Sequence, residues 1–340
     1  MSAILHKYTG KFRTGRDLDV DDATIFLDEL ITSSDESILA DVFRSWNQKG
    51  ITADEIFSIA RVMRERCVGI ETMHSQVVDI VGTGGSRNKT FNVSTAAAFV
   101  IAGCGAAVAK HGNRAATSNT GSADVLAALG VEPAVDAATA MRCLDDIGIC
   151  FMFAPNFHRL SPTLAKVRRG LGFPTIFNCV GPLCNPARAQ HQVIGVWDRK
   201  LVEIMADALS RLGTGKSWIV HGSEGLDEIS LSGSTFVAAV ENASVTSFEI
   251  APEDFGYEPR STASIRVGSA SESSDLILDI LAGRQSEPAA ETIAVINAAA
   301  ALYVAGYATG LVQGVSMAIE SIRLGRASEK LDQLVEATTI

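Results

Sequence analysis

Two short apolar runs in this chain each end in a polar loop that contains glycine, and this feature constrains the fold more than any other. Residues 77–81 lead into Gly82-Thr83-Gly84-Gly85, and residues 106–110 lead into His111-Gly112-Asn113-Arg114. A helical pattern follows each loop. A strand, a glycine-bearing turn and a helix in this order are typical of a parallel sheet with helices on its faces. Ligands of such sheets bind at the carboxyl ends of the strands, where both loops fall.

The same alternation continues through the middle of the chain, whereas residues up to about 67 show helical patterns only. Strands are predicted at residues 77–81, 106–110, 150–153, 193–196 and 218–221, helices at 94–103, 123–129, 138–147, 164–171, 201–212 and from 275 onward, and a hairpin at 236–250. Near the N-terminus, Ser33 with Glu36 and Thr52 with Glu55 have capping-box spacing. The patterns predict an α/β fold: a small helical part, then a mostly parallel sheet flanked by helices.

Composition excludes several classes of function. The 340 residues carry a formal net charge of −10, which gives no basic footprint for nucleic acid. The six cysteines form no Cys-x-x-Cys pair, so we expect reduced thiols in a cytoplasmic protein. Two uncharged stretches, residues 90–109 and 292–319, are rich in alanine and predict buried helices rather than membrane spans. We expect no signal peptide, because residues 1–16 contain no apolar run.

The two loops have the residue types of an anion site. Glycines let the backbone approach a bulky anion, and Ser94 and Thr95 add hydroxyls at the start of the next predicted helix. The first loop is neither a Walker A loop nor a dinucleotide fingerprint, because the required lysine and third glycine are missing. Lys110 adds a positive charge before the second loop. Two such loops predict a ligand with phosphate at both ends; the alternatives are a tight turn for the first loop and a solvated turn for the second.

Two further signals concern a metal and a carboxylate. Asp227 and Glu228 follow a predicted strand, and adjacent carboxylates there suit Mg2+ held by few protein ligands and by substrate oxygens. Arg168 and Arg169 have the chemistry to grip a carboxylate. The alternatives are a surface acidic loop and a solvated helix face. Together with the loops, these residues describe a phosphoribosyl diphosphate site with an acidic acceptor beside it.

At this point the chain resembles the anthranilate phosphoribosyltransferase family of tryptophan biosynthesis over essentially its whole length. The motifs that carry the resemblance are Gly82-Thr83-Gly84-Gly85, Asn92-Val93-Ser94-Thr95, Lys110-His111-Gly112-Asn113-Arg114, Val167-Arg168-Arg169, Thr175-Ile176-Phe177-Asn178, Gly181-Pro182-Leu183 with Asn185-Pro186, and Gly225-Leu226-Asp227-Glu228. The resemblance implies a helical domain at residues 1–72, joined by mid-chain helices at about 160–190, and an α/β domain at residues 73–340. It also implies a homodimer through the helical domain.

The resemblance implies a role for each motif. Phosphoribosyl diphosphate would be bound by Gly82, Gly85, Ser86, Thr90, Asn92, Val93, Ser94, Thr95, Lys110, His111, Gly112, Asn113, Arg114, Ala115, Ala116, Thr117, Ser118 and Ser122. Anthranilate would be bound by Gly82, His111, Asn113, His158, Arg168 and Pro182. Two Mg2+ ions per subunit would be held by Ser94, Asp227 and Glu228. Lys110, Asn113 and Arg168 are the candidate catalytic residues.

The implied reaction transfers the phosphoribosyl group to the amine of anthranilate and releases diphosphate. The alternatives are a nucleoside phosphorylase of similar fold and a non-catalytic, nucleic-acid-binding paralogue. Two positions depart from the family pattern. Ser86 replaces an acidic residue after the glycine loop, which predicts an altered magnesium dependence, and the His-Pro-Ala element reads His158-Arg159-Leu160.

Overall fold

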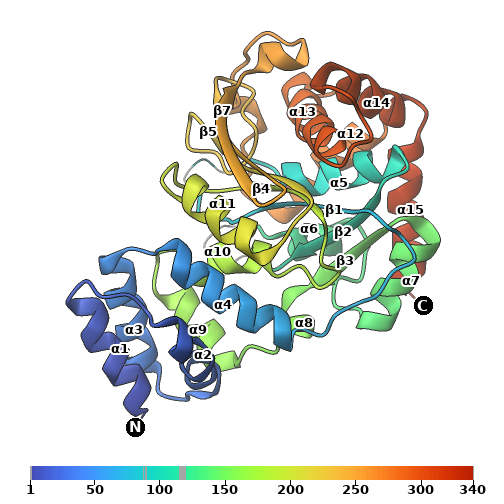
Figure 1. Ribbon diagram of the computed structural model, residues 1–340. Coiled ribbons are helices and arrows are strands. Elements are labelled where there is room, and N and C mark those ends of the chain that lie inside the picture. The colour runs from blue at the N-terminus through green and yellow to red at the C-terminus, as the bar shows by residue number, and fades with distance from the viewer. Residues whose placement is uncertain (1, 87, 89, 115–119, 340) are drawn as a thin grey trace.

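One mixed sheet forms the centre of the molecule (Figure 1). The computed structural model describes residues 2–86, 88, 90–114 and 120–339, and its seven strands follow the order β3-β2-β1-β4-β5-β6-β7. The strands are β1 (Val77–Gly82), β2 (Ala107–Gly112), β3 (Ile149–Phe153), β4 (His191–Gly195), β5 (Lys216–Gly222), β6 (Thr235–Glu241) and β7 (Ser244–Ile250). Neighbours from β3 to β5 are parallel, and β6 and β7 add an antiparallel edge. The predicted α/β class is confirmed.

Helices precede, cover and follow this sheet. They are α1 (Ala3–Arg13), α2 (Ala23–Thr32), α3 (Glu36–Lys49), α4 (Ala53–Arg66), α5 (Val93–Gly103), α6 (Ser122–Ala128), α7 (Ala137–Ile147), α8 (Ala154–His158), α9 (Pro162–Gly170), α10 (Ile176–Leu183), α11 (Leu201–Leu212), α12 (Ala270–Leu281), α13 (Pro288–Val304), α14 (Leu311–Arg323) and α15 (Arg326–Thr339). No helix in the described ranges is long and apolar enough to cross a membrane.

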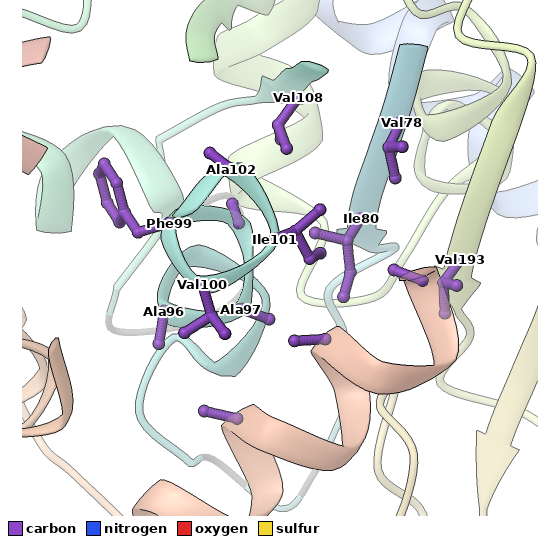
Figure 2. Packing of buried hydrophobic residues seen from close by; sticks show 14 of the residues in the cluster. Val78, Ile80, Ala96, Ala97, Phe99, Val100, Ile101, Ala102, Val108 and Val193 are labelled. Carbon is purple, nitrogen blue, oxygen red and sulfur yellow. The ribbon is translucent and has the colours of Figure 1, made fainter. Parts of the chain in front are cut away.

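The sheet buries side chains on both faces, as the side-chain period of two requires. On β5, Trp218 and Val220 belong to the apolar cluster that contains α5 and α13, whereas Ile219 belongs to the cluster that contains α4 and α11. Figure 2 shows the first cluster, with Ile101 of α5 pointing toward Ile80 of β1. Because α5 is buried on nearly every side, it holds its N-terminus rigidly at the carboxyl end of β1.

The N-terminal helices pack together with α9 and α10, which come from the middle of the chain (Figure 1). Their shared cluster is aromatic at the centre, where Phe12 stacks on Trp46 with ring centroids 4.8 Å apart. The edge of Phe26 meets the same indole at 5.5 Å. The second apolar cluster continues from these helices to one face of the sheet. The domain boundaries given above stay a prediction.

Local signals agree with the structure at most helix ends and turns. Thr52 and Glu55 form the predicted capping box at the start of α4, and Asn242 and Ala243 turn the hairpin with positive φ. The predicted capping box of Ser33 with Glu36 is wrong. Asp35 caps α3 instead, because its carboxylate lies close enough to accept from two first-turn amides, at 3.0 and 3.1 Å.

Candidate active site

The glycine loop leaves β1 and is tied down by three parts of the chain. Thr83 N donates to Gly195 O at 2.8 Å, and Asn178 Nδ2 donates to Thr83 O at 3.1 Å. Gly84 N donates to Asp227 Oδ2 at 2.9 Å. A Cβ at Gly82 would lie 2.8 Å from the same carboxylate oxygen, so glycine is required there. The loop and the acidic pair, which are far apart in the sequence, therefore form one unit.

The end of the glycine loop packs against other loops. Gly85 has a φ of 87°, and a Cβ there would lie 2.8 Å from the Pro174 ring. Ser86 is buried, and its Oγ donates to Gly225 O at 2.8 Å and lies 3.0 Å from Asn88 O. The hydroxyl of Ser86 thus joins two loops, while its predicted role toward phosphoribosyl diphosphate stays a prediction.

The N-terminus of α5 lies next to the glycine loop. Asn92 is its N-cap residue, and Asn92 Oδ1 accepts from Thr120 Oγ1 at 3.1 Å and from Ser273 Oγ at 3.2 Å. Val93 is fully buried, and its backbone N–H donates to Phe91 O at 2.8 Å. Thr95 is also buried, and its Oγ1 has no hydrogen-bond partner. Thr90, two residues before this N-cap, forms an isolated antiparallel β-bridge with Arg266.

Lys110 connects β2 to the α5 N-terminus and the acidic pair. Its Nζ donates to Ile80 O at 2.6 Å and to Ser94 Oγ at 3.2 Å, and only 3% of the residue is exposed. Burial lowers the pKa of the Lys110 ammonium, and the negative charges of Asp79 and Glu228 oppose this. A buried cation between carboxylates, with a hydroxyl at its side, is an electrostatic centre for a polyanionic ligand.

The donor set around Asp227 and Glu228 fits magnesium. Burial raises the pKa of Glu228 to about 8, the nearby Asp227 charge adds to this, and Lys110 opposes it. The Ser94 backbone N–H also donates to the Glu228 carboxylate. Two carboxylates and the Ser94 hydroxyl are hard oxygen ligands, and a close carboxylate pair favours a cation. In the described part of the chain, no group of three His, Cys, Asp or Glu side chains offers a competing site.

Two histidines meet beside the second loop. His111 and His158 lie with their Nε2 atoms 3.2 Å apart, so one ring donates to the other. Burial lowers the pKa of His111 to about 3 and that of His158 to about 4. Both rings are therefore neutral at pH 7, and the pair offers polar, uncharged atoms to an aromatic acceptor. His158 Nδ1 is buried without a hydrogen-bond partner.

The rest of the second loop is more open. Asn113 and Arg114 are exposed, and Arg114 lies 3.8 Å from Asp124. Gly112 must be glycine, because a Cβ would collide with Ser122 Oγ and lie 2.8 Å from the Phe151 ring. The predicted ligands Ala115, Ala116, Thr117 and Ser118 lie outside the described residues.

Arg168 lies on α9, which packs with the N-terminal helices. Its guanidinium lies over the Phe177 ring of α10, 5.0 Å from the centroid. Burial lowers its pKa to about 10, and its Nε is buried without a hydrogen-bond partner. Pro182, at the other end of α10, accepts from Gln192 Nε2 at 3.0 Å through its carbonyl. A guanidinium with a buried donor that has no partner in the protein is prepared for an anionic ligand.

Sequence reasoning did not give Asn178 or Gly195 a place in the site. Asn178 holds the glycine loop through its amide, and Gly195 is required because a Cβ there would fall onto the Asp227 carbonyl. Gly195 lies inside the predicted strand at 193–196 and ends β4 in the structure; a glycine near the carboxyl end of a strand is a usable signal for close backbone approach.

Comparisons with known proteins decide the family. A family model described as "Glycosyl transferase family, a/b domain" matches residues 74–328. The anthranilate phosphoribosyltransferase of Anaeromyxobacter dehalogenans (strain 2CP-1) is 43% identical over 338 residues, which cover 99% of each chain. The chain belongs to the anthranilate phosphoribosyltransferase family. Membership makes it a glycosyltransferase of tryptophan biosynthesis, as the resemblance implied.

Solved members of the anthranilate phosphoribosyltransferase family have the same fold. The enzyme from Thermus thermophilus superposes with a TM-score of 0.88 at 34% identity, covering 98% of this chain and 99% of its own. The enzyme from Saccharomyces cerevisiae, solved in complex with PRPP and Mg, has a TM-score of 0.88 at 26% identity, covering 100% and 99%. A further structure of the Saccharomyces enzyme contains 4-fluoroanthranilate.

Proposed function

We propose that this chain transfers the phosphoribosyl group of 5-phosphoribosyl 1-diphosphate to the amine of anthranilate at the carboxyl edge of β1 and β2. The observation that carries the proposal is the joining of the anion loops to the acidic pair. Gly84 N donates to Asp227, and Lys110 bonds Ser94 beside Glu228. The names of the relatives support this reaction over the nucleoside phosphorylase and the non-catalytic paralogue.

The chain's own residues bind and orient both ends of the phosphoribosyl diphosphate. The glycine loop and the α5 N-terminus are the proposed phosphate-binding elements, where the Thr95 hydroxyl is a donor without a partner in the protein. The Lys110 charge lies between these elements and stabilises negative charge as it develops on the diphosphate. Among the described residues of the second loop, Asn113 and Arg114 are exposed to solvent, where a ligand can reach them.

The acceptor is bound on the α10 side of the same edge. Arg168 pairs with the anthranilate carboxylate through the donor that lacks a partner in the protein. His111, His158 and Pro182 border the aromatic ring, with Asn113 beside the amine. An aromatic amine is largely neutral at pH 7, so catalysis comes from positioning and electrostatics rather than from a strong general base.

Magnesium belongs to this reaction, as the solved Saccharomyces complex supports. Ser94, Asp227 and Glu228 would hold two ions per subunit. Bound there, Mg2+ neutralises the diphosphate and makes it a better leaving group. The raised pKa of Glu228 supports this assignment, because two close carboxylates need a cation to stay ionised together.

We further propose a cytoplasmic homodimer that associates through the helical domain. Exposed apolar side chains on the N-terminal helices support it: Ile25 is 55% exposed and Val20 is 40% exposed. Six free cysteines agree with a reducing compartment. Light scattering on wild type and Ile25→Asp tests the interface; an Ile25→Asp protein of unchanged mass would contradict it.

A fluorescence assay tests the proposed activity. Anthranilate consumption is followed with phosphoribosyl diphosphate and Mg2+, and a nucleoside with inorganic phosphate serves as the matched substrate pair. We expect turnover only with anthranilate and phosphoribosyl diphosphate. Cleavage of the nucleoside without consumption of anthranilate would establish the phosphorylase instead.

A further inference from the structure

A buried carboxylate lies beneath both loops and has no part in the site as described so far. Asp79 is in the middle of β1 and is completely inaccessible to solvent. Burial raises the pKa of its carboxyl to about 6, and Lys110 opposes this. A buried charge is costly unless it is paired and hydrogen-bonded, so its presence needs an explanation.

Donors from three segments surround the Asp79 carboxylate. His111 N donates to Oδ1 at 3.3 Å, and Asn185 Nδ2 donates to Oδ2 at 2.8 Å. The Gln192 side-chain amide, from the paired position on β4, also favours the charged form of this carboxyl and lowers its pKa. Asn185 Nδ2 lies 2.8 Å from Ala109 O as well, and Gln192 Nε2 donates to Pro182 O. Asp79 is thus bonded directly to the His111 backbone and, through the Asn185 amide, to the Ala109 carbonyl, both of which belong to β2.

We infer that Asp79 is a positioning residue for the transfer reaction, which rests on the function proposed above. Its carboxylate fixes the end of β2, which carries Lys110 and His111, through the His111 N–H bond. Through Asn185 it also fixes the Ala109 carbonyl of the same strand. Its charge balances the buried Lys110 ammonium, which leaves Glu228 available for a metal ion. Asp79 itself touches no substrate.

The exchange Asp79→Asn separates this role from simple packing. The amide keeps the shape but removes the charge, and its NH2 group meets a donor on one side or the other, because His111 N and Asn185 Nδ2 both donate. We expect kcat to fall about 10- to 100-fold and KM for anthranilate to rise, as for other partners that orient reacting groups. If Asp79 only stabilised the fold, Asp79→Asn would lower the melting temperature and the active fraction but leave KM unchanged.

Two further variants complete the test. Asn185→Ala removes one donor but keeps the charge and the His111 bond, so we expect KM for anthranilate to rise about threefold, the effect of one hydrogen bond. Asp145→Asn is the matched control, because Asp145 also accepts from a hydroxyl and a backbone amide, those of Thr72 and Met73, away from the site. Its kinetic constants should equal those of wild type.

The outcomes distinguish this inference from the proposed function. A wild-type protein that consumes no anthranilate overturns the function. An active wild type with unchanged kcat and KM in folded Asp79→Asn overturns the positioning role. If Asp79→Asn does not fold, Asn185→Ala decides: an unchanged KM for anthranilate overturns the inference, and a raised one with wild-type KM in Asp145→Asn supports it.

Discussion

Two buried groups of charges, one in the helical part and one at the sheet edge, are built in opposite ways. In the helical part, the Glu55 carboxylate accepts from Lys49 Nζ at 2.9 Å, Leu18 N at 3.0 Å and Thr52 N at 3.1 Å. Lys49 also pairs with Asp17 at 2.6 Å. Glu55 is fully buried, and both of its oxygens have donors inside the protein.

The charges at the sheet edge are not balanced by the protein alone. Burial and Asp227 raise the pKa of Glu228 to about 8, and Arg168 keeps a buried Nε without a partner. His158 Nδ1 and Thr95 Oγ1 are also buried without partners. Buried charge that is fully paired stabilises the fold of the helical part, whereas buried polar atoms without partners mark the place at the sheet edge where we expect a ligand to bind.

The sharpest test of this difference removes the acidic pair. Asp227→Ala with Glu228→Ala takes away the oxygen ligands for Mg2+, so we expect turnover to fall about a thousandfold or more, since metal stabilisation contributes several kcal/mol. Stability should change little, because relief of the repulsion between the two carboxylates offsets the lost bond from Gly84 N to Asp227. Steady-state kinetics and thermal melting measure both quantities. Wild-type turnover in the folded double variant would end the magnesium assignment.

The opposite result is expected in the helical part. Glu55→Ala leaves Lys49 buried beside one remaining carboxylate, and we expect the free energy of unfolding to fall by about 3–5 kcal/mol. Both KM values should stay at the wild-type level below the melting temperature. Urea unfolding and kinetics on the same sample check this, and a changed KM with unchanged stability would break the comparison.

Arg168→Ala tests the unpaired guanidinium. A charge-assisted pair contributes about 1.5–3 kcal/mol, so KM for anthranilate should rise about 10- to 100-fold. KM for phosphoribosyl diphosphate should change little. Arg169→Ala, an exposed neighbour on α9, is the matched control. Equal loss for both substrates would mean that Arg168 supports the packing of α10 instead.

The histidine pair predicts how stability depends on pH. In the unfolded chain each imidazole takes a proton near its usual pKa of about 6.5, whereas the folded pKa values are about 3 for His111 and about 4 for His158. The unfolded state binds more protons in this window, so stability falls as pH falls below about 6.5. At pH 5.5 the loss is about 1.4 kcal/mol per imidazole. Urea unfolding of wild type and His158→Gln measures it; parallel pH profiles would contradict the assignment.

The smallest expected effect concerns Ser86. Ser86→Asp replaces a hydroxyl that donates to Gly225 O by a carboxylate that the carbonyls of Gly225 and Asn88 repel. The displaced carboxylate is a hard-cation ligand, so we expect inhibition at high Mg2+ that wild type lacks. Activity against Mg2+ concentration tests this. Identical profiles would show that Ser86 serves only the turn.

Local patterns predicted the elements well and the contacts between them poorly. The glycine loops, the strand ends and the hairpin turn are read from neighbouring residues, since φ preference and side-chain period act over a few positions. The Ser33 prediction failed even at this range, because Asp35 is the N-cap residue and accepts from the amides of Ser37 and Ile38. The sequence did not assign a role to Asn178 or Asn185, because the hydrogen-bond partners of a side-chain amide depend on the tertiary structure.

The sequence by itself determined the fold class, the two anion loops and, through ordered motifs, the family. The fold class and the loops follow from short-range backbone geometry. The family follows from combinations of residue types that few other kinds of site require. Only the tertiary structure decided which donors meet which acceptors: Gly84 with Asp227, Lys110 with Ser94, and Asp79 with His111. Burial and the pKa shifts that follow from it come from packing of segments distant in sequence, so no local pattern contains them.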